Sequence, residues 1–280
     1  MGLPMANRLV TRYPVRASDR SEEIGRTVAA SRGMEFFESP SDAVDGCEFV
    51  ILMLPDSDAV ADVLGSGILE RMGTGATLID MGSSDPLRTR ENAELLGGRG
   101  IEMIDAPVSG GVRGATDGTL SIMVGGPEAA LERARPLLEL LGKKIHHVGP
   151  AGSGHAVKAL NNLLSATTLL ISCEAMSAAK RLGLDPETVL AALNVSSGRS
   201  FSTEMKFPTY ILDESFDSGF TAALMLKDMR IAQSLGAALG SPTGLGTSSV
   251  DFWARAVEEL PPGADHTEIW NWIQGTGGTG

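Results

Sequence analysis

Residues 152–162 read GSGHAVKALNN and carry a lysine and an asparagine four positions apart. The glycines lead into a predicted helix, on which Lys158 and Asn162 share one face because residues i and i+4 are neighbours on a helix surface. A lysine amine close to a bound carboxylate and a cofactor can accept or deliver the proton of a hydroxyl group. Considered alone, Lys158 is better explained as a surface lysine whose charged end reaches water.

A second segment, DAPVSGG at residues 105–111, follows a predicted strand. Pro107 stiffens the turn, and Gly110 and Gly111 expose backbone N–H groups beside the hydroxyl of Ser109. Such a turn can bind a carboxylate because no bulky side chain stands in the way. By itself, the segment is equally consistent with a plain glycine turn.

Two further sets of residues are candidates for lining a cofactor. In the LKD sequence at 226–228, which follows Phe220, Lys227 can approach a cofactor with Asp228 orienting it. Considered alone this signal is weak, because an exposed Lys-Asp pair is usually just solvated. Leu54 and Pro55, together with Ser83, occupy strand-end positions that can line a nicotinamide ribose.

The elements that must position these residues alternate between strands and helices over the first 150 residues. Predicted strands cover 48–54, 76–80, 101–105, 119–124 and 145–148, and helical periodicity covers 57–71, 86–96 and 127–141. Strands that are apolar on both faces and separated by helices predict an α/β fold, a doubly wound, Rossmann-type, mostly parallel sheet. In this fold a ligand binds at the carboxyl ends of the strands.

The pattern changes after residue 150, and only helices are predicted from there. They cover about 154–180, a segment opening with Asp185-Pro186-Glu187, roughly 221–239 and 247–259. Asp185 is a typical N-cap, and Pro186 suits the first helical position. We therefore expect a dinucleotide-binding domain at 1–150 and a helical domain for substrate binding and oligomerisation at 151–280.

The beginning of the chain departs from a complete dinucleotide fold. Met1–Ala6 is already helix-like, and a predicted strand at Tyr13–Ser18 ends at Asp19. Such a fold needs an apolar strand and a glycine-rich turn before this helix, and neither is present. Two interpretations remain open: the written start is an internal methionine, or the amino terminus is truncated.

The residues after the Tyr13–Ser18 strand bear on the choice of cofactor. An acid at this position accepts hydrogen bonds from the adenosine ribose and repels a 2′-phosphate, so Asp19 favours NAD. The neighbouring Arg20 can instead receive a phosphate, which keeps NADP possible. NAD is the preferred prediction.

In order, DAPVSGG, the GTLSIMVGG of 118–126, GSGHAVKALNN, the SSGRS of 196–200 and LMLKD resemble the β-hydroxyacid dehydrogenase family. That family includes 3-hydroxyisobutyrate dehydrogenase, tartronate semialdehyde reductase and, more distantly, 6-phosphogluconate dehydrogenase. The resemblance implies that Lys158 is the catalytic acid/base and that Asn162 helps to hold the substrate. It also implies that Ser109 and Gly110, with Gly111 beside them, bind the substrate carboxylate. The residues expected around the cofactor are Gly2 (the last glycine of a GxGxxG), Asp19, Arg20, Leu54, Pro55, Ser83, Phe220 and Lys227.

The resemblance predicts an oxidoreductase that transfers a hydride between a short 3-hydroxy carboxylic acid and NAD(P). The SSGRS sequence is more similar to 3-hydroxyisobutyrate dehydrogenases than to tartronate semialdehyde reductases, and 6-phosphogluconate enzymes have a much longer helical region. Two other classes remain as alternatives. The missing first strand favours a non-catalytic dinucleotide-binding or scaffold protein, and an imine-reducing relative is disfavoured because those relatives usually replace the lysine.

Composition excludes several classes of partner. A net charge of −12 argues against nucleic acid, which requires a basic face. Two distant cysteines exclude a disulfide framework, and four histidines without a Cys/His cluster give no support to a metal site. The longest apolar stretch, 163–173, is interrupted by serine and threonine and indicates a buried helix. We expect a cytoplasmic protein without membrane contact.

The resemblance further implies a homodimer or homotetramer that assembles through the helical domain. Four aromatic residues near the carboxyl end are candidates for closing such an interface, although they are equally suited to a core. They are Phe252, Trp253, Trp270 and Trp272.

Overall fold

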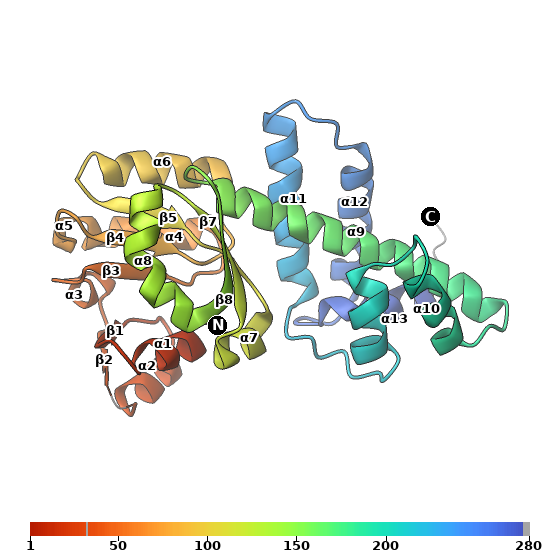
Figure 1. Cartoon of the computed structure of the whole chain (residues 1–280). Coiled ribbons are helices and arrows are strands. Elements are labelled where there is room, and N and C mark those ends of the chain that lie inside the picture. The colour runs from red at the N-terminus through yellow and green to blue at the C-terminus, as the bar shows by residue number, and fades with distance from the viewer. Residues whose placement is uncertain (32, 277–280) are drawn as a thin grey trace. The chain divides into compact units, whose positions relative to one another are not determined.

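The computed structural model describes residues 1–31 and 33–276 and divides into two compact units, Met1–Lys158 and Ala159–Gly280 (Figure 1). Whereas sequence alone predicts a boundary at 150/151, the junction lies inside one helix, α9 (Ser153–Arg181). Lys158 is the last residue of the N-terminal unit. Asn162 belongs to the helical unit but lies one turn further along the same helix.

The N-terminal unit contains a six-stranded sheet in the order β3-β4-β5-β7-β6, with β8 paired to β7. Its strands are β3 (Phe49–Leu52), β4 (Thr77–Asp80), β5 (Glu102–Asp105), β6 (Val108–Ser109), β7 (Leu120–Gly125) and β8 (Gly142–Gly149). The β3-β4-β5 and β7-β8 ladders are parallel, and β7 runs antiparallel to β5 and β6. The predicted Rossmann-type, mostly parallel sheet is confirmed. Both antiparallel pairs involve β7, and one of them is with β6, a short strand that sequence alone does not predict and that only two residues separate from β5.

Helices cover both faces of this sheet. Consecutive residues of a strand point to opposite faces, so each strand contributes side chains to both of the interfaces with helices. In β4, Leu78 packs with the helices α4 (Ser57–Val63) and α6 (Pro86–Gly97), whereas Ile79 packs with α1 (Gly2–Leu9) and α8 (Glu128–Leu141). The helices are drawn on the two sides of the sheet in Figure 1. The core of this unit therefore consists of two apolar layers separated by the strands.

The helix predicted at 57–71 is not continuous. It consists of α4, a π-helical segment at Leu64–Ile68 and α5 (Leu69–Arg71). Gly67 interrupts it with a φ of 91°, a conformation that favours glycine. Other short helices, α3 (Pro40–Ala43) and α7 (Gly111–Asp117), complete the connections of this unit.

A separate two-stranded parallel sheet contains β1 (Val15–Ala17) and β2 (Met34–Phe36), which flank α2 (Glu22–Ala29). In the ladders of the described residues, β1 pairs with β2 and β3 pairs with β4, so each keeps one open edge. Val15 of β1 and Ile51 of β3 pack against the same apolar cluster. The predicted strand at Tyr13–Ser18 is confirmed as β1, whereas β2 had not been predicted.

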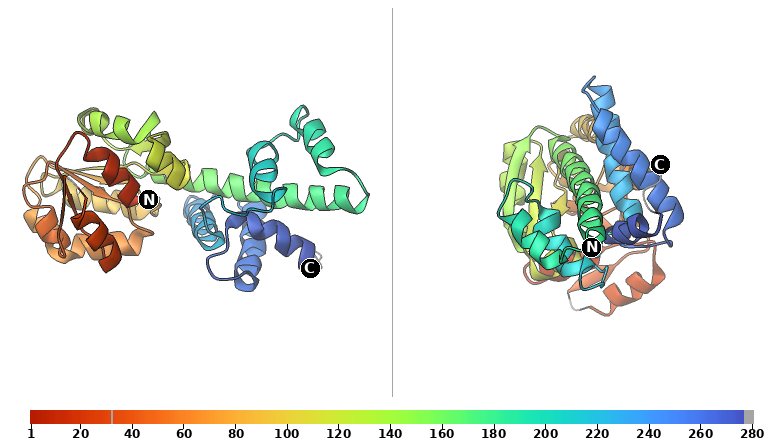
Figure 2. Two further views of the ribbon diagram at one scale, coloured as in Figure 1. Left: turned by 90° about the horizontal axis from the view of Figure 1, so that it is seen from below. Right: turned by 90° about the vertical axis from the view of Figure 1, so that its right-hand side faces the viewer.

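The helical unit contains α9 from Ala159 onward and the helices α10 to α13, together with one π-helix and one 3-10 helix. Its described residues form no strand. Its further elements are α10 (Pro186–Asn194), the π-helix η2 (Ser202–Ile211), α11 (Ala222–Ala238), α12 (Gly244–Glu259), the 3-10 helix η3 (His266–Glu268) and α13 (Ile269–Thr276). Figures 1 and 2 show α11 and α12 side by side. The predicted N-cap of α10 is confirmed, since Asp185 accepts a hydrogen bond from the Thr188 amide.

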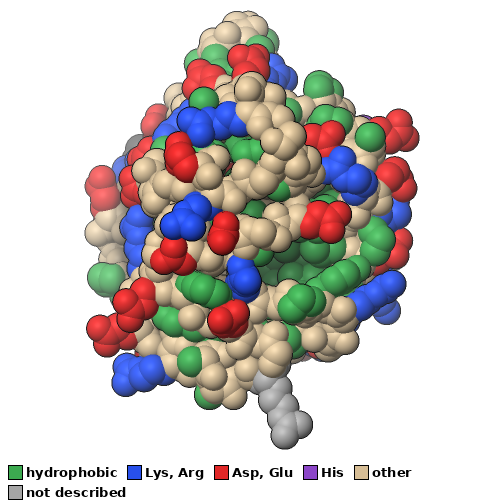
Figure 3. Space-filling view, turned by 90° about the vertical axis from the view of Figure 1, so that its left-hand side faces the viewer, with side chains coloured by type: hydrophobic (Ala, Val, Ile, Leu, Met, Phe, Trp, Pro, Cys, Tyr) green, Lys and Arg blue, Asp and Glu red, His purple; other side chains and the backbone are tan. Residues whose placement is uncertain are grey.

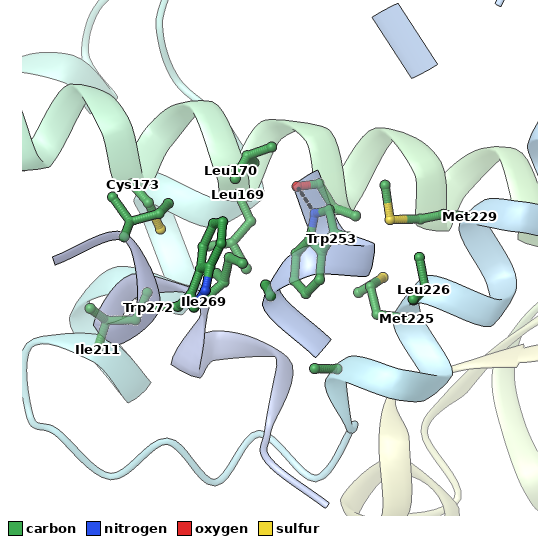
Figure 4. Packing of buried hydrophobic residues seen from close by; sticks show 14 of the residues in the cluster. Leu169, Leu170, Cys173, Ile211, Met225, Leu226, Met229, Trp253, Ile269 and Trp272 are labelled. Carbon is green, nitrogen blue, oxygen red and sulfur yellow. Dashed lines mark hydrogen bonds between the residues drawn. The ribbon is translucent and has the colours of Figure 1, made fainter. Parts of the chain in front are cut away.

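The core of the helical unit is built around Trp253, which is fully buried (Figure 4). Its indole N–H donates to the backbone carbonyl of Ala166 in α9 at 3.3 Å, which satisfies the polar atom of this large side chain. Trp272 is also buried, and Phe252 and Trp270 pack against the same cluster. Trp253 and Trp272 therefore belong to the core, whereas Phe252 and Trp270 are partly buried at its edge.

Helix α9 is, among the described residues, the one helix that is long and apolar enough to cross a membrane. A core helix of a soluble protein passes the same test of length and composition. Leu169, Cys173 and Met176 of α9 are buried in the Trp253 cluster, as expected for the buried helix predicted at this position. On the face of the chain in Figure 3, basic and acidic side chains are interspersed, and the described residues there form no continuous basic patch.

An added N-terminal segment that forms an apolar strand and a glycine-rich turn before Gly2 should raise the affinity for NADH by orders of magnitude. The strand would pair with the open edges of β1 and β3, and the turn would place backbone amides at the start of α1, where a pyrophosphate binds. Fluorescence titration with NADH measures the dissociation constant of the unextended chain, of the extended chain and of a control chain. An added segment of equal length with serine and asparagine at the apolar positions is the control, and equal dissociation constants for all three chains would contradict the prediction.

Candidate active site

The turn after β6 has the geometry that the DAPVSGG sequence predicts. Ser109 ends β6, and Gly110 and Gly111 open α7 with φ values of 130° and 63°. Both values lie in the region that residues with a side chain rarely adopt, so the two glycines allow the chain to turn here. Ser109 is half-buried and both glycines are exposed, which leaves their backbone amides accessible to a small anion.

The start of α9 is fixed to the end of β5 by one carboxylate. The Gly152 amide donates to Asp105 Oδ1 at 2.7 Å, and the His155 amide donates to Oδ2 at 2.8 Å. Gly154 lies so close to the sheet that a Cβ atom there would be 2.3 Å from the Met123 carbonyl oxygen. Lys158, half-buried, follows one turn later on this anchored helix.

The turns after β3 and β4 lie against each other at the carboxyl edge of the sheet. Asp80 accepts hydrogen bonds from the Gly82 amide at 3.0 Å and the Ser84 hydroxyl at 2.8 Å, which hold the turn containing Ser83. A Cβ atom on Gly82 would be 2.6 Å from the Leu54 carbonyl oxygen. The structure thus brings together the turn of Leu54 and Pro55 and the turn of Ser83, as a cofactor-lining role requires.

At the carboxyl end of β1, Asp19 is exposed and accepts a hydrogen bond from the Ser21 amide at 2.8 Å. The guanidinium of Arg20 forms an ion pair with Asp62 at 2.9 Å, with both side chains exposed. An exposed ion pair contributes little free energy, so Arg20 stays available for a 2′-phosphate, as the sequence suggested. Gly2 is the first residue of α1, and a Cβ atom on it would lie 3.7 Å from Met53 Cβ.

In the helical unit, Asp228 joins two predicted site residues. The Asn162 amide nitrogen donates to Asp228 Oδ2 at 2.5 Å, and Lys227 Nζ lies 3.0 Å from Oδ1. Asn162 and Asp228 are 5 % and 1 % exposed, so the pair is held in a site with little water. The sequence pattern suggested that Asp228 orients Lys227, but nothing in it indicated the bond to Asn162, which lies 66 residues away.

A second buried network, not anticipated from sequence, holds the segment that carries Phe220. Asp265 accepts hydrogen bonds from the Ser218 hydroxyl and from the Gly219 and Phe220 amides. Burial raises the pKa of Asp265, but hydrogen bonds from His266, Thr267 and Ser218 outweigh it, so the net pKa lies well below the usual range. The Phe220 ring packs edge-on against His266 with centroids 5.9 Å apart.

Lys206 lies in the same interior and is 5 % exposed. Its ammonium group donates to the Ser165 hydroxyl at 2.9 Å, and burial lowers its pKa to about 8. Burial also lowers the pKa of His266. Isolated lysine and histidine residues give no sequence signal for such a network, because burial is set by the packing of η2 against its neighbours.

Both halves of the chain match known families. Residues 1–149 match the family described as the NAD binding domain of 6-phosphogluconate dehydrogenase. Residues 152–273 match the family described as NAD-binding of NADP-dependent 3-hydroxyisobutyrate dehydrogenase. This chain belongs to the β-hydroxyacid dehydrogenase family.

Individual relatives agree over most of the chain. A 2-(hydroxymethyl)glutarate dehydrogenase of Eubacterium barkeri is 37 % identical over 239 residues, which are 84 % of this chain and 79 % of the relative. The mitochondrial 3-hydroxyisobutyrate dehydrogenase of Bos taurus is 36 % identical over 258 residues, 89 % of this chain and 76 % of the relative. A solved structure of Mycobacterium tuberculosis 3-hydroxyisobutyrate dehydrogenase with L-serine has a TM-score of 0.92 and 32 % identity, covering 98 % of this chain and 96 % of that one.

These findings confirm the predicted family, the oxidoreductase class and the nicotinamide cofactor of this dehydrogenase. The described residues at the carboxyl ends of β1, β3 and β4 fit such a cofactor. Asp19 presents an exposed carboxylate after β1, and the paired turns of Leu54 and Ser83 form a fixed edge. The enzyme interpretation therefore replaces the scaffold alternative.

Asp19→Ala should narrow the preference of the dehydrogenase for NAD over NADP. The change removes an acceptor for the ribose hydroxyls and a charge that repels a 2′-phosphate. The ratio of kcat/KM for the two cofactors measures the preference. Asp62→Ala is the companion variant, since it releases Arg20 from an exposed ion pair and should raise kcat/KM for NADP only slightly while Asp19 stays in place. An unchanged ratio in Asp19→Ala would show that this carboxylate is not at the ribose.

Proposed function

We propose that this chain transfers a hydride between a short 3-hydroxy carboxylic acid and NAD(P), with Lys158 as the general acid/base. The observation that carries the proposal is the constrained lysine-asparagine pair of α9. Asp105 anchors the helix one turn before Lys158, and Asp228 holds the amide of Asn162 one turn after it. A helix fixed at its start, with the Asn162 side chain held next to Lys158 along it, is suited to orienting a substrate hydroxyl.

The chain's own residues have separate tasks in this mechanism. The amides of Gly110 and Gly111, with the Ser109 hydroxyl, bind the substrate carboxylate, and Asn162 orients the substrate. Lys158 accepts the hydroxyl proton as the C–H bond of the carbinol carbon breaks, and it returns a proton to the carbonyl oxygen in the reverse direction. The nicotinamide ring, when bound, accepts or supplies the hydride. Leu54, Pro55, Ser83, Phe220 and Lys227 are proposed to line it, with Asp19 and Gly2 at its adenosine and pyrophosphate parts.

The names of the relatives indicate the substrate class. 2-(Hydroxymethyl)glutarate, 3-hydroxyisobutyrate and L-serine all have a hydroxymethyl group on the carbon next to a carboxylate, and they differ in the second substituent of that carbon. A site built for this class has to fix the carboxylate and the hydroxyl and to tolerate variation beside them. We therefore propose a 3-hydroxyisobutyrate-like acid as the substrate, with NAD preferred over NADP.

We also propose that the chain forms a homodimer or homotetramer through its helical unit and works in the cytoplasm. Three large apolar residues form an exposed stripe on α9, with exposed fractions of 46 % for Leu160, 69 % for Leu164 and 57 % for Ile171. Exposed large apolar residues on one face of a helix are suited to an interaction site. Both cysteines are unpaired, which agrees with a reducing compartment.

Lys158→Met should abolish most turnover of 3-hydroxyisobutyrate with NAD, because a positioned acid/base contributes roughly 10²–10⁴-fold. NADH binding and the melting temperature should stay unchanged. Lys158→Arg should not restore activity, because a guanidinium stays protonated and cannot accept the proton. Steady-state kinetics measures kcat, with the exposed Lys144→Met of the same unit as the control. If Lys158→Met keeps kcat within about threefold, below the range of a general acid/base, the assignment is wrong.

Replacing Leu164 and Ile171 together by glutamate should lower the oligomeric mass of the chain. Two charges on the proposed contact stripe would have to be desolvated on assembly, which costs several kcal/mol per ion. Sedimentation velocity of both chains measures the mass. Leu239→Glu serves as the control, because this leucine is equally exposed, at 68 %, but lies at the C-cap of α11, on a different element from the stripe. An unchanged mass in the double variant would rule out this face.

A further inference from the structure

His155 is completely buried in the N-terminal unit between two carboxylates that also are buried. Its Nε2 atom lies 3.8 Å from Asp80 Oδ2, and its Nδ1 atom lies 3.8 Å from Asp105 Oδ2. Asp80 ends β4 and Asp105 ends β5, whereas His155 lies in the first turn of α9. The ring therefore bridges the carboxyl edge of the sheet and the helix that carries Lys158.

The hydrogen-bond pattern shows how the ring is held. Thr89 Oγ1 lies 2.9 Å from the Asp85 carbonyl oxygen, within the first turn of α6. The same Oγ1 lies 2.8 Å from His155 Nδ1, so one hydrogen bond joins the hydroxyl and the ring. Nε2 makes no hydrogen bond among the described residues, and the acceptor it faces is Asp80.

The backbone of the same residue is held as well. The first amides of a helix have no partner within it, and a carboxylate beside them also interacts favourably with the helix dipole. Asp105 takes this role for α9 by accepting from the amides of Gly152 and His155. The amide of His155 is thus attached to the sheet by Asp105. Its ring contacts Thr89 of α6 and faces Asp80 at the end of β4.

We propose that His155 is a positioning residue: its ring, held between Asp80, Asp105 and Thr89, fixes the first turn of α9 and thereby the place of Lys158. The inference rests on the proposed acid/base role of Lys158. The side chain of His155 is fully buried, so the proposed role is to position Lys158 rather than to take part in proton transfer. A displacement of about 1 Å at a reacting group is enough to cost roughly 10²-fold in rate, so small movements of this turn should be visible in kcat.

The test compares His155→Leu with His155→Gln. Leucine has a similar size but cannot hydrogen-bond to Thr89 or face Asp80 with a polar group, whereas the glutamine amide keeps a hydrogen-bonding group. We expect His155→Leu to lower kcat roughly 10- to 100-fold while KM and the affinity for NADH stay nearly unchanged. His155→Gln should restore most of the rate. Equal kcat for both variants and the parent chain would overturn the proposal.

A double-mutant cycle separates positioning from a general loss of stability. If His155 acts through Lys158, His155→Leu should have no further effect on the residual turnover of the Lys158→Met chain. Effects that multiply in the double variant would overturn the proposal. Hydrogen exchange at the amides of Gly152 and His155 provides a readout that does not depend on activity, and it should be faster in His155→Leu with protection elsewhere retained. If the proposed acid/base role of Lys158 is wrong, Lys158→Met itself keeps its turnover. That result is distinct from a failure of the positioning role, in which only His155→Leu keeps its turnover.

Discussion

The carboxylate of Asp105 accepts hydrogen bonds from the start of α9 at the point where β5 ends, and both partners are buried. A buried carboxylate is costly unless its lone pairs are used, so this contact tolerates little change in geometry. The strand is fixed by its parallel ladder with β4, and the helix is fixed by the carboxylate. The turn that binds the substrate carboxylate in our proposal begins four residues after the same aspartate. One side chain thus sets the frame for two parts of the proposed site.

The helical unit uses a comparable device in a different setting. Asp228 in α11 holds Asn162 in α9, and Asp265 holds the residues that precede α11. Behind them, the Trp253 cluster packs α9, α11 and α12 into one apolar interior. Polar contacts select one arrangement of the helices, while the burial of large apolar side chains supplies the favourable free energy. Asn162 is positioned by both: its side chain bonds to Asp228, and its helix α9 is packed by the Trp253 cluster.

Much of the architecture could be predicted because its signals are local. The strands at 77–80 and 102–105 are short apolar runs bounded by turn residues, and α10 begins at an Asp-Pro-Glu sequence. The candidate site residues followed from ordered motifs, and the family that those motifs indicated is confirmed. The motifs placed Lys158 and Asn162 on one helix, as α9 has them.

The features that escaped prediction depend on contacts between distant residues. β2 has only three residues, Met34–Phe36, and an alternation this short is too weak a signal, so that its pairing with β1 is what identifies it. η2 contains Pro208, which lacks the N–H that a regular helix needs and therefore argues against a helix in any reading of the sequence. His155 and Asp228 stand beside the motif residues, but their roles come from partners 66 residues away in each case. Local periodicity carries no information about such pairs.

The close approach of Gly154 to the sheet has a consequence for how this sequence can vary. Beyond the Met123 oxygen, a Cβ atom at this position would lie 2.8 Å from both the Asp105 carbonyl and its carboxylate, atoms that cannot move without breaking the anchor. Ser153 beside it is half-buried and already carries a Cβ atom. In a library of random variants selected for turnover, position 154 should accept glycine alone while position 153 accepts many residues. The glycine at position 154 is thus required by the short distance between helix and strand, rather than by a need for chain flexibility.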